Sequence, residues 1–372
     1  MAPRTATLLV LLLVIVGGCR CASKPKTPSV EMSDAALADA LAGAVRVAAG
    51  DLDGDGRLEL MAVDRERLRI VGPDGTTRAT LPAPGAPQVL RIADVDGDGR
   101  PELLAGWGRS AARPGAKARI ALYRLDGDRL VEQTLLEPTT ERAQIVQILP
   151  MPGDRKAVLA AWFASKYDVS IARLPLERGA TPVPVATVRM AMSIALGDVD
   201  GDGTQDLVIG RPYGDHQQAE GDAFVLREDG SRVAIPIRGG VSSLALADLD
   251  GDGTLEVLLG DGWDRDYGRL ARALLTCARW ADGAFTAELV EESEGQFVLW
   301  SIDAADLDGD GRPEVITRGP EQVRVVSMRD GRLQGRRIAG SCDDVAVVNL
   351  DGRGGDELLL LCGGRVEVHR GE

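Results

Sequence analysis

DLDGDGRLEL, at residues 51–60, is the stretch that decides the fold, because near-identical copies of it recur along the chain. The copies are DVDGDGRPEL (94–103), DVDGDGTQDL (198–207), DLDGDGTLEV (248–257), DLDGDGRPEV (306–315) and the degraded NLDGRGGDEL (349–358). Self-similarity with a period of 20–50 residues is the signature of a repeat architecture. The gap between the copies at 94 and 198 is about twice the others, so we place a hidden unit at 144–161, where only Asp154 remains of the acids. We therefore count seven units.

Each unit has a short apolar strand before the acidic loop and another after it, such as VLRIA (89–93) and ELLAG (102–106). Two strands of alternating polarity follow, as in ARIALYRL (118–125) and RLVEQTLL (129–136). Alternation between Gly/Asp turns indicates strands rather than helices. Four strands match one propeller blade, and seven blades close a ring without open edges. A solenoid would need capping units, and none is evident. We predict an all-β, seven-bladed β-propeller over residues 33–372.

The seventh unit has three strands in the sequence, VAVVNL, ELLLLC and RVEVHR. We expect residues 29–44 to supply its fourth strand, which would close the ring by pairing the two ends of the chain. The segment DAALADALAG (34–43) could equally form a short helix.

The acidic loops carry carboxylates at positions 1, 3, 5 and 9 of every intact copy. Four carboxylates within nine residues repel one another unless a cation lies between them. Oxygen ligands at alternate positions suit Ca²⁺; the backbone carbonyl of position 7 would add a ligand, and Gly at position 6 permits the turn. We therefore predict about five Ca²⁺ ions. The predicted ligands are Asp51, Asp53, Asp55, Arg57 and Glu59; Asp94, Asp96, Asp98, Arg100 and Glu102; Asp198, Asp200, Asp202, Thr204 and Asp206; Asp248, Asp250, Asp252, Thr254 and Glu256; and Asp306, Asp308, Asp310, Arg312 and Glu314.

Three alternatives fit these loops less well. An EF-hand has its last acid at position 12 between two helices, and Mg²⁺ seldom occupies an all-protein cage. DGDG could simply be a good turn sequence, but five copies with an acid at position 9 argue against that. In the copy at 349–358, Arg353 stands at position 5, and its charge could replace that of a metal. We expect no metal at Asp154.

The pattern AxGDxDGDGxxELxxG resembles the FG-GAP/VCBS repeat, which occurs in integrin α-subunit propellers and in many bacterial secreted proteins. The similarity covers roughly residues 45–372. It implies a calcium-binding propeller whose ligands fall on loop positions 1, 3, 5, 7 and 9. In similar integrin propellers, the face away from the calcium binds the partner.

The loops between second and third strands should lie on the rim opposite the acidic loops, and they hold many of the scarce aromatic residues. Aromatic and polar groups together suit recognition of a protein or a sugar. Alternatively, the rings fill gaps between neighbouring blades. The candidate partner-binding residues are Trp107, Trp162, Tyr167, Tyr213, His216, Trp263 and Tyr267.

The first 32 residues read as an export signal and a tether. Arg4 precedes an apolar run at 6–16 that is too short to span a membrane but suits a signal peptide at 1–18. The run ends in VGGC (16–19), which resembles a lipobox and implies a lipid on Cys19; ordinary secretion is the alternative. Residues 19–32 would form a lipidated tether. Arg20, in place of Asp, favours the outer membrane, so we expect an exported envelope protein held by its lipid only.

The formal net charge of −14 argues against a nucleic-acid partner. The sequence has two histidines and contains no GxSxG, HExxH or P-loop motif. We therefore expect a non-catalytic binding module for protein or carbohydrate, and the alternative is a propeller enzyme acting on polysaccharide or peptide. Cys342 and Cys362 flank the last hairpin, where they could form a disulfide or stay reduced, and Cys277 has no visible partner.

Overall fold

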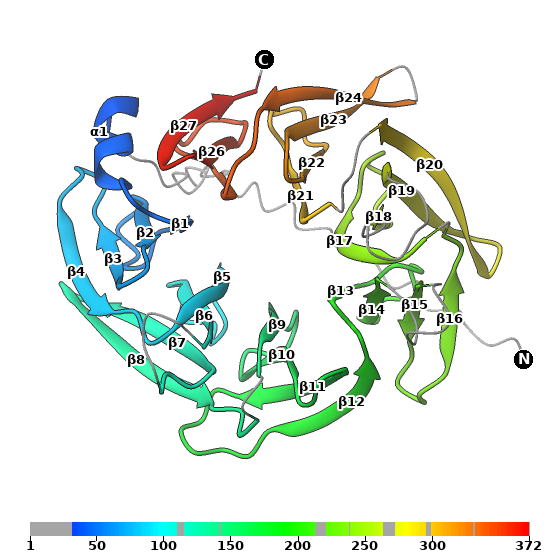
Figure 1. Cartoon of the computed structure of the whole chain (residues 1–372), viewed down its shortest axis with the longest axis horizontal. Helices are drawn as coiled ribbons and strands as arrows, with labels where there is room; N and C mark the ends of the chain where they lie inside the picture. Colours follow the sequence, from blue (N-terminus) through cyan, green and yellow to red (C-terminus); the bar gives the residue numbers. More distant parts are fainter. Residues whose placement is uncertain are drawn as a thin grey trace, which may run out of the picture.

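The strands form seven antiparallel sheets set around a common axis, which confirms the predicted seven-bladed propeller (Figure 1). This computed structural model describes residues 32–109, 115–140, 143–212, 221–237, 239–262, 272–294, 299–329 and 332–371. Six sheets have four strands and the last has three. The hidden unit is confirmed as well, because residues 145–189 form a complete blade.

Within each blade the strands lie in sequence order from the centre of the ring outwards (Figure 1). The innermost strands are β1 (Arg46–Gly50), β5 (Ala86–Ala93), β9 (Ile145–Pro150), β13 (Ser193–Gly197), β17 (Val241–Ala247), β21 (Ser301–Ala305) and β25 (Asp344–Val348). The second strands are β2 (Glu59–Val63), β6 (Glu102–Gly108), β10 (Ala157–Phe163), β14 (Asp206–Arg211), β18 (Glu256–Gly262), β22 (Glu314–Arg318) and β26 (Glu357–Cys362).

The two outer positions complete the blades. The third strands are β3 (Arg67–Val71), β7 (Arg119–Asp126), β11 (Asp168–Pro175), β15 (Asp222–Leu226), β19 (Arg272–Ala281), β23 (Val323–Arg329) and β27 (Arg365–Arg370). The fourth strands are β4 (Thr77–Pro82), β8 (Arg129–Leu136), β12 (Val183–Arg189), β16 (Arg232–Ile235), β20 (Ala284–Glu294) and β24 (Arg332–Ala339).

The second strands explain the continuous apolar runs of the sequence. Every residue of β2, β6 and β22 is buried, because a neighbouring blade covers each face of these strands. The outer strands have one face in water, so polar residues such as Arg129 and Thr134 of β8 and Thr187 and Arg189 of β12 stand at exposed positions, although Val183 and Val185 of β12 are exposed as well. A strand buried on both faces loses its alternation of polarity, whereas a half-buried strand keeps it.

The blades approach each other closely at the glycine that ends the motif of the second strand. A side chain at Gly106 would place its Cβ 2.7 Å from Ile145 Cγ2, and one at Gly210 would lie 2.5 Å from Val241 Cγ1. Ile145 and Val241 belong to the innermost strands of the following blades. Glycine is therefore required here for packing between blades.

The ring closes through a helix, so our expectation of a fourth strand from residues 29–44 is wrong. Helix α1 (Asp34–Ala40) starts at Ser33, whose hydroxyl accepts the Ala36 N–H at 3.3 Å, and lies beside β27 (Figure 1). Leu37 and Leu41 are buried among residues of the first and last blades. Apolar burial between the two ends of the ring takes the place of strand pairing.

Two cysteines of the last blade are joined: Cys342, just before β25, forms a disulfide with Cys362 at the end of β26. This confirms the first of the two states that we considered for this pair. Cys277 in β19 is a buried free thiol, and burial raises its pKa to about 12. Among the helices of the described residues, none is long and apolar enough to cross a membrane. Cys19 and the signal and tether segments up to residue 31 lie outside the described part.

Candidate metal loops

Each intact loop brings three carboxylates together on one rim of the ring. The loop follows an innermost strand and precedes a second strand, and the innermost strands all run toward the same rim. In every loop, one oxygen from each of positions 1, 3 and 9 lies within 4.8 Å of the others. The groups are Asp51, Asp53 and Glu59; Asp94, Asp96 and Glu102; Asp198, Asp200 and Asp206; Asp248, Asp250 and Glu256; and Asp306, Asp308 and Glu314.

The loop folds around the carboxylate of position 1. Asp51 Oδ1 accepts the N–H of Gly54 at 2.8 Å, and Oδ2 accepts that of Gly56 at 2.9 Å. Both glycines have positive φ, 76° and 81°, a conformation that a residue with a side chain rarely adopts. The other intact loops repeat the two bonds from Gly to the first Asp. The predicted role of the Gly at position 6 is thereby confirmed.

The carboxylate of position 9 is buried beneath the loop. Glu59 is 0% exposed and accepts the Leu52 N–H at 2.9 Å, and Glu102 accepts the Val95 N–H at 3.1 Å. Burial, together with the nearby charge of Asp53, raises the pKa of Glu59 to about 7; burial does the same for Glu102. A buried carboxylate beside other carboxylates is stabilised in its charged form by a cation.

The carboxylate of position 5 lies outside these groups of three. Asp55 Oδ1 accepts the backbone N–H of Arg57 at 2.8 Å, and the same bond recurs in the other four loops. In the first loop the Arg57 guanidinium also contacts Asp55, at 3.1 Å. Of the carboxylates that we predicted as ligands, those of positions 1, 3 and 9 converge, and that of position 5 braces the turn. The backbone carbonyl of position 7 stays a predicted ligand.

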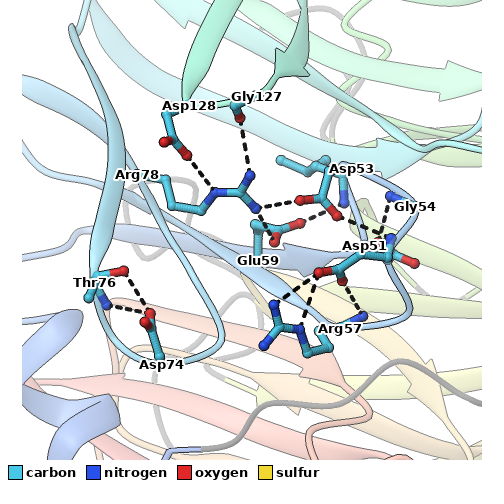
Figure 2. Close-up of polar contacts among 12 residues, drawn as sticks. Asp51, Asp53, Gly54, Arg57, Glu59, Asp74, Thr76, Arg78, Gly127 and Asp128 are labelled. Atoms are coloured by element: carbon cyan, nitrogen blue, oxygen red, sulfur yellow. Dashed lines mark hydrogen bonds and ion pairs between the residues drawn. The ribbon is translucent and has the colours of Figure 1, made fainter.

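An arginine reaches into four of the five groups, and we did not predict it from the sequence. In the first loop, Arg78 Nη1 lies 2.5 Å from Asp53 Oδ2 and 2.8 Å from Glu59 Oε1 (Figure 2). Its Nε also contacts Asp128 of the next blade at 3.1 Å, so this arginine links the loop to its neighbour. Arg78 belongs to β4, and its side chain passes over Gly72. A Cβ atom at position 72 would lie 3.2 Å from Arg78 Cδ, so a side chain there would crowd the arginine.

In the other three cases the arginine belongs to or directly follows the third strand. Arg124 pairs with Asp96 at 2.8 Å and with Glu102 at 3.1 Å; Arg227 pairs with Asp200 at 2.5 Å and with Asp206 at 2.6 Å. Arg279 pairs with Glu256 at 3.1 Å. A signal was present in the sequence, since an Arg follows the apolar run of the third strand in YRL, LRE and ARW. Each guanidinium offsets part of the negative charge of its loop.

The loop at 306–314 differs, because no arginine pairs with its group of three within the described residues. Burial and the charges of Asp308, Asp310 and Asp306 all raise the pKa of Glu314. If the register of β22 with β23 is continued by one residue, Ser327 lies opposite Glu314. At the same position of the preceding blade, Arg279 lies opposite Glu256. This loop therefore has the least compensated negative charge of the five.

The two divergent units are built differently from the intact loops. Asp154 pairs with Arg173 at 2.6 Å, so its charge already has a partner. In the last unit, Asn349 Nδ2 donates to the carbonyl of Arg353 at 2.7 Å, and Glu357 accepts the Leu350 N–H at 2.6 Å. Neither unit supplies one of the five groups of three carboxylates.

The residues fit a calcium ion by the chemistry of their donors. Each group offers three carboxylate oxygens, the hard ligands that Ca²⁺ prefers, on a rigid turn. Soft sulfur or imidazole ligands, which would favour zinc or copper, are absent from these groups.

The aromatic candidates separate into core residues and residues of intermediate exposure. Trp107 is 0% exposed, and its Nε1 donates to the Tyr123 hydroxyl at 3.0 Å, so it packs in the core and is not a partner-binding residue. Trp162 packs against the core between two blades and is partly exposed. Tyr167 is partly exposed, with Lys166 Nζ and the Arg189 guanidinium each 4.7 Å from its ring centre. Tyr213, His216, Trp263 and Tyr267 lie outside the described residues.

Family models identify repeats in the chain. The FG-GAP-like repeat matches residues 51–105, and the FG-GAP repeat matches residues 190–226. These segments contain the first three acidic loops, so the chain carries FG-GAP repeats within a seven-bladed propeller. No curated protein matches the chain.

Solved structures share the fold at low sequence identity. The structure of BBS1N in complex with ARL6DN superposes with a TM-score of 0.56 at 14% identity, covering 90% of this chain and 96% of that one. A chain of the yeast Nup82–Nup159–Nup116 nucleoporin complex gives 0.51 at 9% identity, covering 84% and 95%. At such identities the likeness shows the fold alone.

Proposed function

We propose that the five groups of three carboxylates bind calcium, and that calcium stabilises the propeller. The supporting observation is that each loop repeats the same trio within 4.8 Å on a glycine turn. The arginine beside each of four trios offsets only part of the negative charge of the three carboxylates, so uncompensated charge remains that a divalent cation can neutralise. Extracellular calcium modules typically bind at about 10⁻⁴–10⁻³ M, so the ion would be structural there.

We further propose that the chain is a lipid-anchored protein of a bacterial cell envelope, attached through Cys19, with the outer membrane as its site. Its role would be that of a non-catalytic binding module. The rim opposite the acidic loops would meet a protein or glycan partner, with Trp162 and Tyr167 as the candidate contacts that lie in the described part. The motifs for export and lipidation in the sequence support this location.

The binding role can be tested by affinity capture from envelope extract with the full-length protein, in calcium and in chelator. We expect a defined partner in calcium and its loss in chelator. The double variant Asp250→Asn/Asp252→Asn should weaken capture, whereas Glu177→Gln, an exposed acid outside the loops, should not. Turnover of glycans or peptides by the purified chain, without any captured partner, would contradict a non-catalytic module.

A further inference from the structure

The centre of the ring contains a cavity of about 430 Å³. It is lined by the innermost strands of the first, second, third, sixth and seventh blades, together with Trp300 and Arg318. Arg46 and Asp344 are the first residues of β1 and β25, and Trp300 directly precedes β21. Since the innermost strands run toward the acidic loops, Arg46, Asp344 and Trp300 lie at the end of the cavity away from those loops.

The lining contains more charged side chains than are joined in ion pairs. It contains three arginines, Arg46, Arg91 and Arg318, and two acids, Asp303 and Asp344. Arg46 Nη1 contacts Asp344 Oδ1 at 3.2 Å, and Asp344 Oδ2 accepts the Val47 N–H at 3.2 Å. That pair is self-contained. Asp303 lies near enough to Arg91 and Arg318 for both guanidiniums to favour its charged form, but no direct ion pair joins these three groups within the described residues, and together they carry one positive charge in excess.

Arg318 is the most enclosed of these groups, at 8% exposed. Its contacts are neutral: Nε donates to the Ser301 hydroxyl at 3.3 Å, Nη1 donates to the Cys342 carbonyl at 3.4 Å, and Trp300 lies 5.3 Å away. Burial lowers the pKa of Arg318, and the nearby charges of Asp344, Asp303 and Asp343 offset only part of this effect. Arg91 is exposed in the cavity and makes no hydrogen bond to any described residue. Both guanidiniums are available to an anion.

Two further side chains of the lining, Asp303 and Trp300, indicate a ligand with more than a negative charge. The Asp303 carboxylate accepts no hydrogen bond from the described residues, so it can accept one from a hydroxyl. Trp300 is 49% exposed, and an aromatic ring of this kind packs against the apolar face of a sugar ring. Planar guanidiniums match a carboxylate bidentately.

We propose that this cavity binds a small carboxylate that also carries hydroxyl groups, the chemistry of a uronic acid. Arg91 and Arg318 bind the carboxylate of the ligand, Asp303 accepts a hydrogen bond from one of its hydroxyl groups, and Trp300 packs against the sugar ring. Arg46, Asp344 and Trp300 lie toward the rim where the proposed partner binds, but the site depends on neither that partner nor the calcium count. A failure here would therefore leave the capture result unchanged.

The test is calorimetric titration of the full-length protein, kept in calcium, with D-glucuronate. Glucose lacks the carboxylate and acetate lacks the hydroxyls, and we expect each to bind at least about tenfold more weakly. Arg91 is exposed and makes no hydrogen bond to a described residue, so Arg91→Gln should fold normally and weaken the binding of glucuronate at least about tenfold. Arg365→Gln, an exposed arginine on β27, is the matched control and should bind as the wild type does.

Arg318→Gln should also weaken binding, and its melting curve will show whether it folds. Three results would overturn the proposal: no saturable heat with glucuronate up to about 10 mM, equal binding of glucose, or unchanged affinity in Arg91→Gln.

Discussion

Arg370, the last residue of β27, forms a bidentate ion pair with Asp34, the first residue of helix α1. The Nη1···Oδ2 distance is 3.0 Å and the Nη2···Oδ1 distance is 2.8 Å. The two residues lie 336 positions apart, so the contact joins the ends of the ring. Leu37 and Leu41 lie next to it and are 2% and 0% exposed. Closure thus combines a surface ion pair with buried leucines, and their contributions can be separated.

We expect Leu41→Ala to lower the free energy of unfolding by about 2–5 kcal/mol, since it opens a cavity in the closure core. Arg370→Ala should cost less than about 1 kcal/mol, because both partners of the ion pair are about half exposed. Urea unfolding in saturating calcium measures both. A loss in Arg370→Ala as large as that in Leu41→Ala would contradict the expectation that the buried leucines contribute more to closure than the ion pair does.

The loop at 306–314 should hold calcium most tightly, because no arginine compensates its carboxylates in the described part. Ser327→Arg would supply that charge and should weaken the tightest calcium site about five- to tenfold, a Coulomb effect of about 1 kcal/mol at a partly exposed site. Titration in competition with a fluorescent calcium chelator measures the affinity of the tightest site. Ser327→Ala is the control and should leave it unchanged. If Ser327→Arg also leaves the affinity of the tightest site unchanged, the arginines do not tune calcium affinity.

Trp107→Ala should lower stability by about 3–5 kcal/mol, because it empties a fully buried site and leaves the Tyr123 hydroxyl without its donor. Thermal unfolding in calcium measures the loss. Trp162→Ala is a useful comparison, since its ring is partly exposed and its loss should be smaller. A Trp107→Ala protein as stable as the wild type would contradict the core placement.

Asp344 makes stability depend on pH. Burial raises its pKa from an ordinary 3.8 to about 6. Between these values the folded protein holds a proton that the unfolded chain has released, so stability falls as the pH rises from about 4 to about 6. We expect the unfolding free energy of the wild type to drop by roughly 2–3 kcal/mol relative to Asp344→Asn over that range. Parallel pH profiles of the two proteins would contradict this assignment.

The repeat pattern was sufficient to predict the blades, because each acidic loop marks the boundary between a first and a second strand. Even the worn unit around Asp154 could be placed by spacing. Helix α1 could not be decided, since Leu37 and Leu41 suit a helix or a strand until the first and last blades are known to be neighbours. Which of them forms depends on contacts between residues far apart in the chain.

The site was predictable in part for a similar reason. Ligand positions within one loop follow from local spacing, so Asp51, Asp53 and Glu59 converge as expected. Arg78 reaches them from another strand, through a gap left by Gly72, and local spacing carries no information on that approach. Trp107 illustrates the same limit, because the sequence left a surface ring and a core ring equally open.

We propose that each of the five intact acidic loops holds one calcium ion. Calorimetric titration of the calcium-free, full-length protein with Ca²⁺ counts these ions. We predict saturation at five ions per chain, with Mg²⁺ unable to replace them at equal concentration. Saturation at one ion or none would show that the carboxylate trios, braced by their arginines and glycine turns, are stable without metal, and would contradict the claim.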